Sequence, residues 1–146
     1  MISELVVDAS VAIKLFVDEE LAEAAEQLFR WLDHTPPARF FVPDLFFIEC
    51  ANILWKYIRR FGYSPQEARE NLSRLLLLPL QTVAASDLLV ASLDLAVKVD
   101  ITAYDASYTA LAASLQVPLV TADRTLARKL DSSGLEVHWL GDLPTN

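Results

Sequence analysis

Four acidic side chains stand out because each follows an expected strand or lies near the start of an expected helix. They are Asp8, Glu49, Asp105 and Asp123. Carboxylates that converge on one point repel each other, and they stay ionised together at neutral pH only beside a cation. Oxygen ligands of this kind suit Mg²⁺ or Mn²⁺ rather than Zn²⁺. Because such an ion activates water and neutralises charge on a phosphodiester, the predicted chemistry is metal-assisted hydrolysis of a phosphate ester.

Short apolar runs alternate with amphipathic segments along the chain, which predicts strands joined by helices. The expected strands cover residues 4–8, 39–42, 80–84, 118–121 and 136–140. The expected helices cover residues 9–17, 19–33, 44–61, 65–77, 86–97 and 103–115, and a short helix begins at residue 123. This alternation predicts an α/β fold in which helices cover both faces of a mostly parallel sheet.

The predicted sheet explains how acids that are distant in sequence can meet. In an open parallel sheet, ligands bind outside the carboxyl ends of the strands. Asp8 and Asp123 follow strands directly. Glu49 and Asp105 lie in helices that start near the same edge. No repeat, low-complexity segment or long linker interrupts the chain, so we expect a single domain over residues 1–146.

The composition predicts a globular protein that associates with another chain. The sequence has 146 residues, 53% of them hydrophobic, and its mean hydropathy of +0.31 is high for a soluble monomer. We therefore expect a second copy to cover part of the apolar surface in a homodimer. The formal net charge of -8 argues against nucleic-acid binding by bulk electrostatics, but it allows phosphate binding through a metal ion or a local basic stripe.

The cysteine content and the hydropathy pattern predict a cytoplasmic protein. Cys50 is the only cysteine, so the chain can form no internal disulfide and no cysteine-based metal site. The N-terminus lacks the basic start of a secretion signal. The most apolar stretch, residues 75–80, is short and contains Pro79, so we expect no membrane span.

Four motifs in order carry a resemblance to a known family. They are V-D-A-S at 7–10, P-D-L-F-F-I-E-C-A-N at 43–52, Y-D-A-S-Y at 104–108 and T-A-D at 121–123. Together they resemble the PIN-domain nucleases, and within them the VapC-type toxins of toxin–antitoxin pairs. The resemblance implies a three-layer α/β/α sandwich around a short parallel sheet. It also implies an endoribonuclease that depends on Mg²⁺ or Mn²⁺, acts on RNA and is blocked by a cognate VapB-like antitoxin.

The resemblance also assigns roles to individual residues. Asp8 and Asp105 are the expected direct metal ligands. Glu49 and Asp123 are expected to act through water or to complete a second metal position. Three polar residues match supporting positions of the family: the hydroxyl residues Ser10 and Thr121, expected to hydrogen-bond the carboxylates, and Asn52, one helical turn beyond Glu49.

Basic residues near these motifs have two interpretations. The stripe of Asn52, Lys56 and Arg59 along one helix face could bind RNA phosphates that flank the cut, or it could be a solvated face. Lys14 could reach the site or pair with an acid.

Other interpretations of the acids stay open at this point. Asp8, Asp105 and Asp123 could each be a helix N-cap. An aspartyl-phosphate phosphatase is disfavoured, because it needs a second Asp at the position that Ser10 occupies. A phosphoacceptor receiver domain is also disfavoured, because it usually needs a lysine late in the sheet and no late expected strand ends in lysine. A housekeeping PIN nuclease and a non-catalytic interaction module on the same fold are the remaining alternatives.

Overall fold

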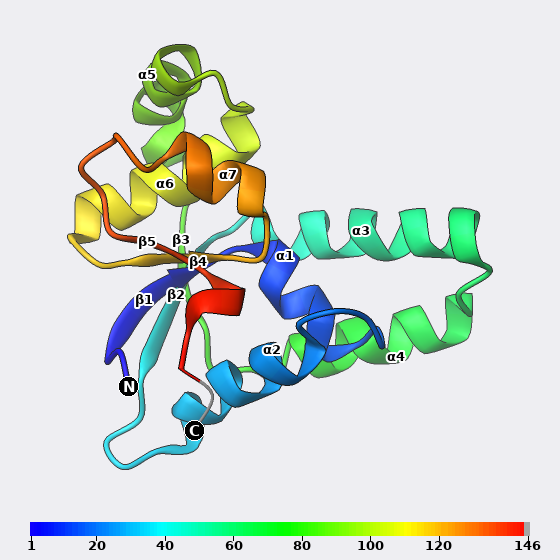
Figure 1. Cartoon of the computed structure of the whole chain (residues 1–146). Coiled ribbons are helices and arrows are strands. Elements are labelled where there is room, and N and C mark those ends of the chain that lie inside the picture. Colours follow the sequence, from blue (N-terminus) through cyan, green and yellow to red (C-terminus); the bar gives the residue numbers. More distant parts are fainter. Residues whose placement is uncertain (145–146) are drawn as a thin grey trace.

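Five parallel strands form one sheet in the computed structural model, which describes residues 1–144. Their order is β3-β2-β1-β4-β5, with β1 in the centre (Figure 1). The strands are β1 Glu4–Val7, β2 Arg39–Pro43, β3 Gln81–Val83, β4 Leu119–Thr121 and β5 Val137–Trp139. All four pairings are parallel, so the predicted α/β fold with a parallel sheet is confirmed.

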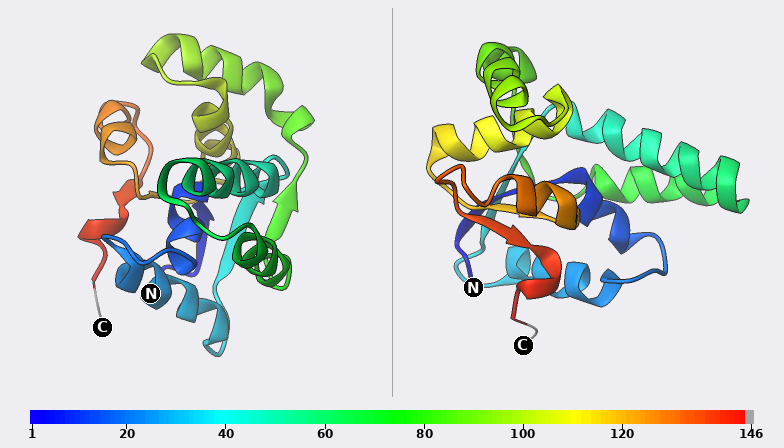
Figure 2. Two further views of the ribbon diagram at one scale, coloured as in Figure 1. Left: turned by 90° about the vertical axis from the view of Figure 1, so that its right-hand side faces the viewer. Right: turned by 45° about the horizontal axis from the view of Figure 1, so that its top comes forward.

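Helices cover both faces of the sheet. The α-helices are α1 Ala9–Ala12, α2 Ala22–Phe29, α3 Phe46–Phe61, α4 Pro65–Leu75, α5 Leu89–Val99, α6 Ala103–Leu115 and α7 Arg124–Lys129. Helices α6 and α7 lie on one side of the sheet and α2 lies on the other, while α3 and α4 extend outward together as a hairpin (Figures 1 and 2). This is the three-layer α/β/α arrangement that the resemblance implies.

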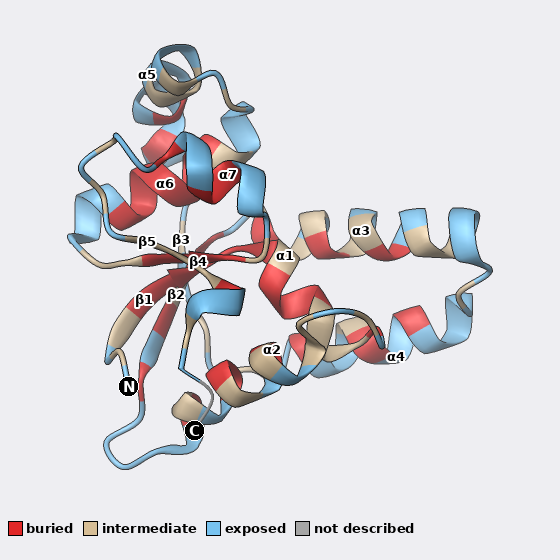
Figure 3. Ribbon diagram, viewed as in Figure 1, coloured by how far each residue is buried: buried red, intermediate tan, exposed pale blue. Residues whose placement is uncertain are grey.

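The core lies on both faces of the sheet, between the central strands and the helices that cover them. Leu5, Val6 and Val7 of β1 are fully buried, as expected for a strand covered on both faces. Helix α6 is buried along residues 106–112, because it packs on the sheet below and α5 lies along its other side (Figure 3). Its alanines allow this close approach. The outer parts of α5 and of the α3–α4 hairpin are exposed (Figure 3).

Two expected helices have different bounds in the structure. The first is only α1, followed by the 3₁₀ turn Ile13–Leu15. The second begins at Ala22 rather than Glu19, after Leu21 adopts a left-handed backbone with φ of 71°. A long-range contact explains the second difference: the Glu19 carboxylate accepts hydrogen bonds from Lys14 and Tyr57, which holds this segment outside the helix.

A third expected helix is divided. The segment predicted as a helix over 86–97 begins with the 3₁₀ turn Ala85–Leu88 and continues as α5 to Val99. Within residues 1–144, no helix combines the length and the apolar character needed to cross a membrane.

Candidate functional site

Asp8 lies at the carboxyl end of the central strand β1 and is buried, with 4% of its surface exposed. Its Oδ2 accepts hydrogen bonds from the Thr121 hydroxyl at 2.8 Å and from the Ser10 hydroxyl at 3.0 Å. Its Oδ1 accepts a longer one, of 3.4 Å, from the Ser10 backbone N–H. Both hydroxyls therefore hydrogen-bond a site carboxylate, as the sequence predicts, while their role in catalysis stays a prediction.

The same two hydroxyls also hold the loop after β4. The Ala122 N–H donates to the Ser10 hydroxyl and the Asp123 N–H donates to the Thr121 hydroxyl, each at 3.1 Å. Asp123 in turn accepts from the Leu126 N–H at 3.1 Å and caps α7. One connected network thus fixes the backbone around both strand-end aspartates.

Helices bring the other two acids to this edge. Glu49 lies in the first turn of α3, and Asp105 lies in the first turn of α6. The N-cap of α6 is Thr102, whose hydroxyl accepts from the Asp105 N–H at 3.1 Å. The capping interpretation therefore describes one function of Asp8 and Asp123, but it is wrong for Asp105.

Burial and mutual repulsion raise the pKa of three of these carboxyls. The pKa of Asp8 is raised, chiefly because burial removes it from water, and the Thr121 and Ser10 hydrogen bonds only partly oppose this. Burial, followed by the charges of Asp8 and Asp105, raises the pKa of Glu49 to about 7. Burial, followed by the charges of Asp8 and Asp123, raises the pKa of Asp105 to about 6.

The charges of neighbouring acids contribute to these shifts. The Asp123 charge acts on Asp8 and Asp105, and the charges of Asp8 and Asp105 act on Glu49. The four carboxylates therefore lie close enough for their charges to be felt within the group. We call this set of four residues the acid edge.

The acid edge fits a hydrated divalent cation. Its donors are all oxygens, and bringing a buried carboxylate and two half-buried ones together without a cation is unfavourable. The Glu49 Oε1 and the neighbouring Tyr108 hydroxyl are buried, and neither finds a hydrogen-bond partner of normal geometry within residues 1–144. In that part of the chain, no three acidic, histidine or cysteine side chains form a ready-made metal cage. An ion such as Mg²⁺ does not require such a cage, because it keeps several waters and uses only one or two carboxylates directly.

Two hollows include residues of the acid edge in their lining. The first, of ≈ 440 Å³, contains Asp105, Asp123, Thr125 and Lys129 in its lining, and we call it the α7 hollow. The second, of ≈ 550 Å³, is the α3 hollow, lined by Ile48, Glu49, Asn52, Ile53, Lys56 and Tyr104. The first hollow therefore borders Asp105 and Asp123, and the second borders Glu49.

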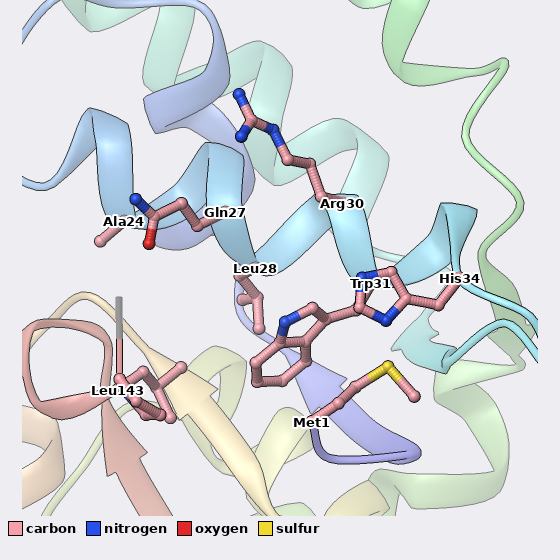
Figure 4. Close-up of a pocket in the computed structure, with 9 residues that line it drawn as sticks. Met1, Ala24, Gln27, Leu28, Arg30, Trp31, His34 and Leu143 are labelled. Carbon is pink, nitrogen blue, oxygen red and sulfur yellow. The ribbon is translucent and has the colours of Figure 1, made fainter. Parts of the chain in front are cut away.

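A further cavity lies elsewhere. It has a volume of ≈ 240 Å³ and is lined by residues of α2, the turn after it and both chain ends, including Trp31, Met1 and Leu143 (Figure 4). Met1 precedes β1, so this cavity lies towards the opposite edge of the sheet from Asp8. None of the predicted site residues lines it.

The basic residues divide into two groups. Lys56 lines the α3 hollow beside Glu49, and Arg59 lies further along α3 with its guanidinium 5.2 Å from the centre of the Trp55 ring. Lys14 follows the second of its two interpretations: its ammonium pairs with Glu19 at 3.0 Å, and only 14% of its side chain is exposed. The Lys14 charge is therefore already paired, and we do not expect Lys14 to bind RNA.

The sequence gives little signal for the support of Asp123. Trp139, at the end of β5, donates its indole N–H to the Ala122 carbonyl at 3.2 Å. The Arg124 guanidinium lies 3.8 Å from the centre of the same ring. A Cβ on Gly141 would lie 2.1 Å from this ring, so only glycine leaves room for it. The one signal in the sequence is a tryptophan at the end of an expected strand, because a buried indole N–H usually needs a hydrogen-bond acceptor.

Comparisons with known proteins agree with this geometry. A sequence profile of the PIN domain matches residues 5–130. Ribonuclease VapC3 of Pyrobaculum aerophilum is 37% identical over 128 residues, which cover 86% of this chain and 94% of that protein.

Solved structures share the fold at lower identity. A toxin–antitoxin complex from Klebsiella pneumoniae matches with a TM-score of 0.65 and 16% identity, over 93% of this chain and 97% of that one. The Mycobacterium tuberculosis toxin VapC20, which cleaves the sarcin-ricin loop, matches with a TM-score of 0.66 and 15% identity, over 90% of this chain and 95% of that one. From the profile match and the identity to VapC3, this chain belongs to the PIN-domain family and is a homologue of the VapC ribonucleases.

Proposed function

We propose that this chain is the toxin of a type II toxin–antitoxin pair, an endoribonuclease that hydrolyses RNA phosphodiesters with Mg²⁺ or Mn²⁺. The observation that carries the proposal is the acid edge, where distant parts of the chain bring carboxylates together with raised pKa values. The family comparison supports the same chemistry, since PIN-domain VapC nucleases depend on divalent metal ions.

Each acid has a proposed task. Asp8 and Asp105 would hold the ion directly, and Ser10 and Thr121 keep the Asp8 oxygens oriented. When bound, the ion would neutralise charge on the phosphate and lower the pKa of attacking water. Without the ion the pKa of Glu49 is raised to about 7, so this carboxyl can exchange a proton with solvent near neutral pH. Asp123 orients solvent at the same edge.

The test is cleavage of single-stranded or looped RNA by the purified chain. We expect cleavage to stop when EDTA removes divalent ions and to restart when excess Mg²⁺ or Mn²⁺ is added. Full activity in excess chelator would refute the metal mechanism. A nuclease contaminant is excluded if Asp105→Asn protein, prepared in parallel, is inactive.

A cognate antitoxin of the VapB type is the proposed protein partner, in keeping with the toxin–antitoxin complex among the structural neighbours. A small reading frame that adjoins this gene and encodes a DNA-binding protein would support the proposal. Co-expression with that protein should relieve growth arrest. A gene that stands alone would favour the alternative of a housekeeping PIN nuclease. We further propose that residues 1–146 act as one domain in the cytoplasm.

A homodimer is proposed from the outer face of α5. Four apolar residues there are 60–77% exposed, and we call them the α5 stripe: Leu89, Val90, Leu93 and Val97. Three of them recur every fourth residue, so they lie along one helix face. In an antiparallel pairing centred on Leu93, Leu89 of one copy meets Val97 of the second copy. The stripe is therefore self-complementary, as a twofold interface requires.

A further inference from the structure

The α3 hollow contains more than an acid site needs. Besides Glu49 it presents an aromatic ring, an amide, a cation and two aliphatic side chains: Tyr104, Asn52, Lys56, Ile48 and Ile53. We propose that this hollow is a base-binding subsite for a nucleotide next to the scissile phosphate. The inference rests on the nuclease function proposed above and gives that function a source of sequence preference.

Tyr104 supplies a stacking surface. Its side chain is 66% exposed, although it immediately precedes Asp105 in the first turn of α6. That turn is fixed, because Thr102 caps it and the Ser107 hydroxyl donates to the Tyr104 carbonyl at 2.6 Å. Proteins that bind single-stranded RNA stack unpaired bases on aromatic rings held in this way. A base on Tyr104 would bring its adjoining phosphate to the acid edge.

Asn52 and Lys56 follow Glu49 along one face of α3. They lie three and seven residues after it, so acid, amide and ammonium stand one above another. An amide donates and accepts at once, which matches the hydrogen-bonding edge of a base. An ammonium matches a phosphate. The order along the helix therefore corresponds to scissile phosphate, base and neighbouring phosphate.

A protein surface is the competing occupant, since Ile48 is also exposed, at 72%. The α5 stripe suits a protein partner better, because its four side chains are aliphatic and the exposed Asp94 and Lys98 lie beside it rather than within it. In the α3 hollow, the Asn52 amide and the Lys56 ammonium lie among the apolar groups. A protein that covered the hollow would have to supply hydrogen-bond partners for the amide and an opposite charge for the ammonium. A nucleotide provides partners for each.

The test measures RNA binding in chelator, where no cleavage occurs. The probes are short oligoadenylate, short oligouridylate and an abasic phosphate chain of the same length, followed by fluorescence anisotropy. We expect wild-type protein to bind at least one base-containing probe about tenfold more tightly than the abasic chain. Tyr104→Ala should remove this difference, and Tyr104→Phe should keep it. Asn52→Ala should change the ratio of affinities for the two oligonucleotides.

Phe61→Ala is the matched control. Phe61 is an aromatic residue of α3 that is 73% exposed and does not line the hollow, so its removal should leave the base-dependent difference unchanged. Equal binding of the abasic chain and both oligonucleotides by wild-type protein would overturn the subsite. So would base-dependent binding that stays intact in Tyr104→Ala protein whose light scattering matches that of the wild type.

A separate cleavage assay with Mg²⁺ distinguishes the two proposals. If wild-type protein cuts RNA but shows no base dependence, the subsite is refuted and the nuclease function stands. If it binds bases through Tyr104 but never cuts RNA, the nuclease function is refuted and the hollow is an RNA-binding site only.

Discussion

The acid edge and the α5 stripe are opposite exceptions to the usual distribution of side chains. At the acid edge, Asp8 is only 4% exposed, Glu49 and Asp105 are half-buried, and Asp123 is exposed. On α5, aliphatic groups face water, and Val97 is 77% exposed. A buried carboxylate and an exposed apolar stripe are both unfavourable in an isolated chain. The comparison shows two surfaces of different chemistry, and we propose that one binds a cation with RNA and the other binds a second copy of the chain.

The largest expected effect comes from removing one charge of the acid edge. Asp105→Asn should lower the cleavage rate by about a thousandfold or more, because it removes a proposed direct ligand without disturbing the helix cap. Growth arrest should disappear with it. Asp131→Asn, the same change at an exposed position just after α7, should have no effect. Cleavage at the wild-type rate by Asp105→Asn would remove Asp105 from the site.

The next effect tests the other side of the comparison. Leu93→Asp places two carboxylates at the centre of the proposed twofold contact and should weaken dimerisation by about 3 kcal/mol or more. Light scattering across a concentration series measures this directly. Leu77→Asp is the control, since Leu77 is 84% exposed but lies after α4. An unchanged dimer in Leu93→Asp would show that α5 is not the interface.

Repulsion at the acid edge predicts how stability depends on pH without metal. The pKa of Glu49 rises from 4.5 to about 7 and that of Asp105 from 3.8 to about 6, so the folded state binds more protons than the unfolded state between these values. Unfolding free energy should therefore fall as pH rises from 4 to 7, by about 2 kcal/mol after allowance for solvent screening of these half-exposed groups.

Urea titrations at several pH values measure this decrease. Added Mg²⁺ should reverse it at pH 8, and Asp105→Asn should flatten it. Metal-free stability that rises over this interval would contradict the assigned electrostatics. The α5 stripe contains no ionisable group, so Leu93→Ala should leave the pH profile unchanged.

The smallest effect concerns the support of the acid edge. Gly141→Ala should lower unfolding free energy by about 1–2 kcal/mol, because its methyl group would overlap the Trp139 ring. That ring holds the Ala122 carbonyl, so cleavage should fall modestly as Asp123 is displaced. Gly134→Ala is not a useful control, since its φ of 80° is itself unfavourable for alanine.

Local patterns in the sequence predict the fold well, because each buried strand is a short apolar run and each helix has a clear period. The helix that was expected to start at Glu19 shows the limit. Its acids suit a helix N-terminus, yet the Glu19 carboxylate accepts hydrogen bonds from Lys14 and from Tyr57, which is distant in sequence. A contact between distant residues cannot be predicted from the local sequence, so the later start of the helix at Ala22 was not expected.

The candidate site divides in the same way. The sequence predicts Asp8, Glu49, Asp105 and Asp123 as site residues because they stand at predictable ends of elements. It does not predict the two hollows, since these depend on how α3, α6 and α7 are arranged in space. Tyr104 and Lys129 therefore gained importance only from the structure. The contacts of the Trp139 ring with Arg124 and with the Ala122 carbonyl likewise depend on the tertiary structure.

The strand order has a consequence for synthesis of the protein. Strand β1 is made first, but its neighbour β4 is made late, and Thr121 of β4 is one of the two hydroxyl residues that hold Asp8. While the chain is still emerging from the ribosome, Asp8, Ser10 and Glu49 are present without Asp105, Thr121 or Asp123. We therefore expect the acid edge to be complete only after the last quarter of the chain has been released.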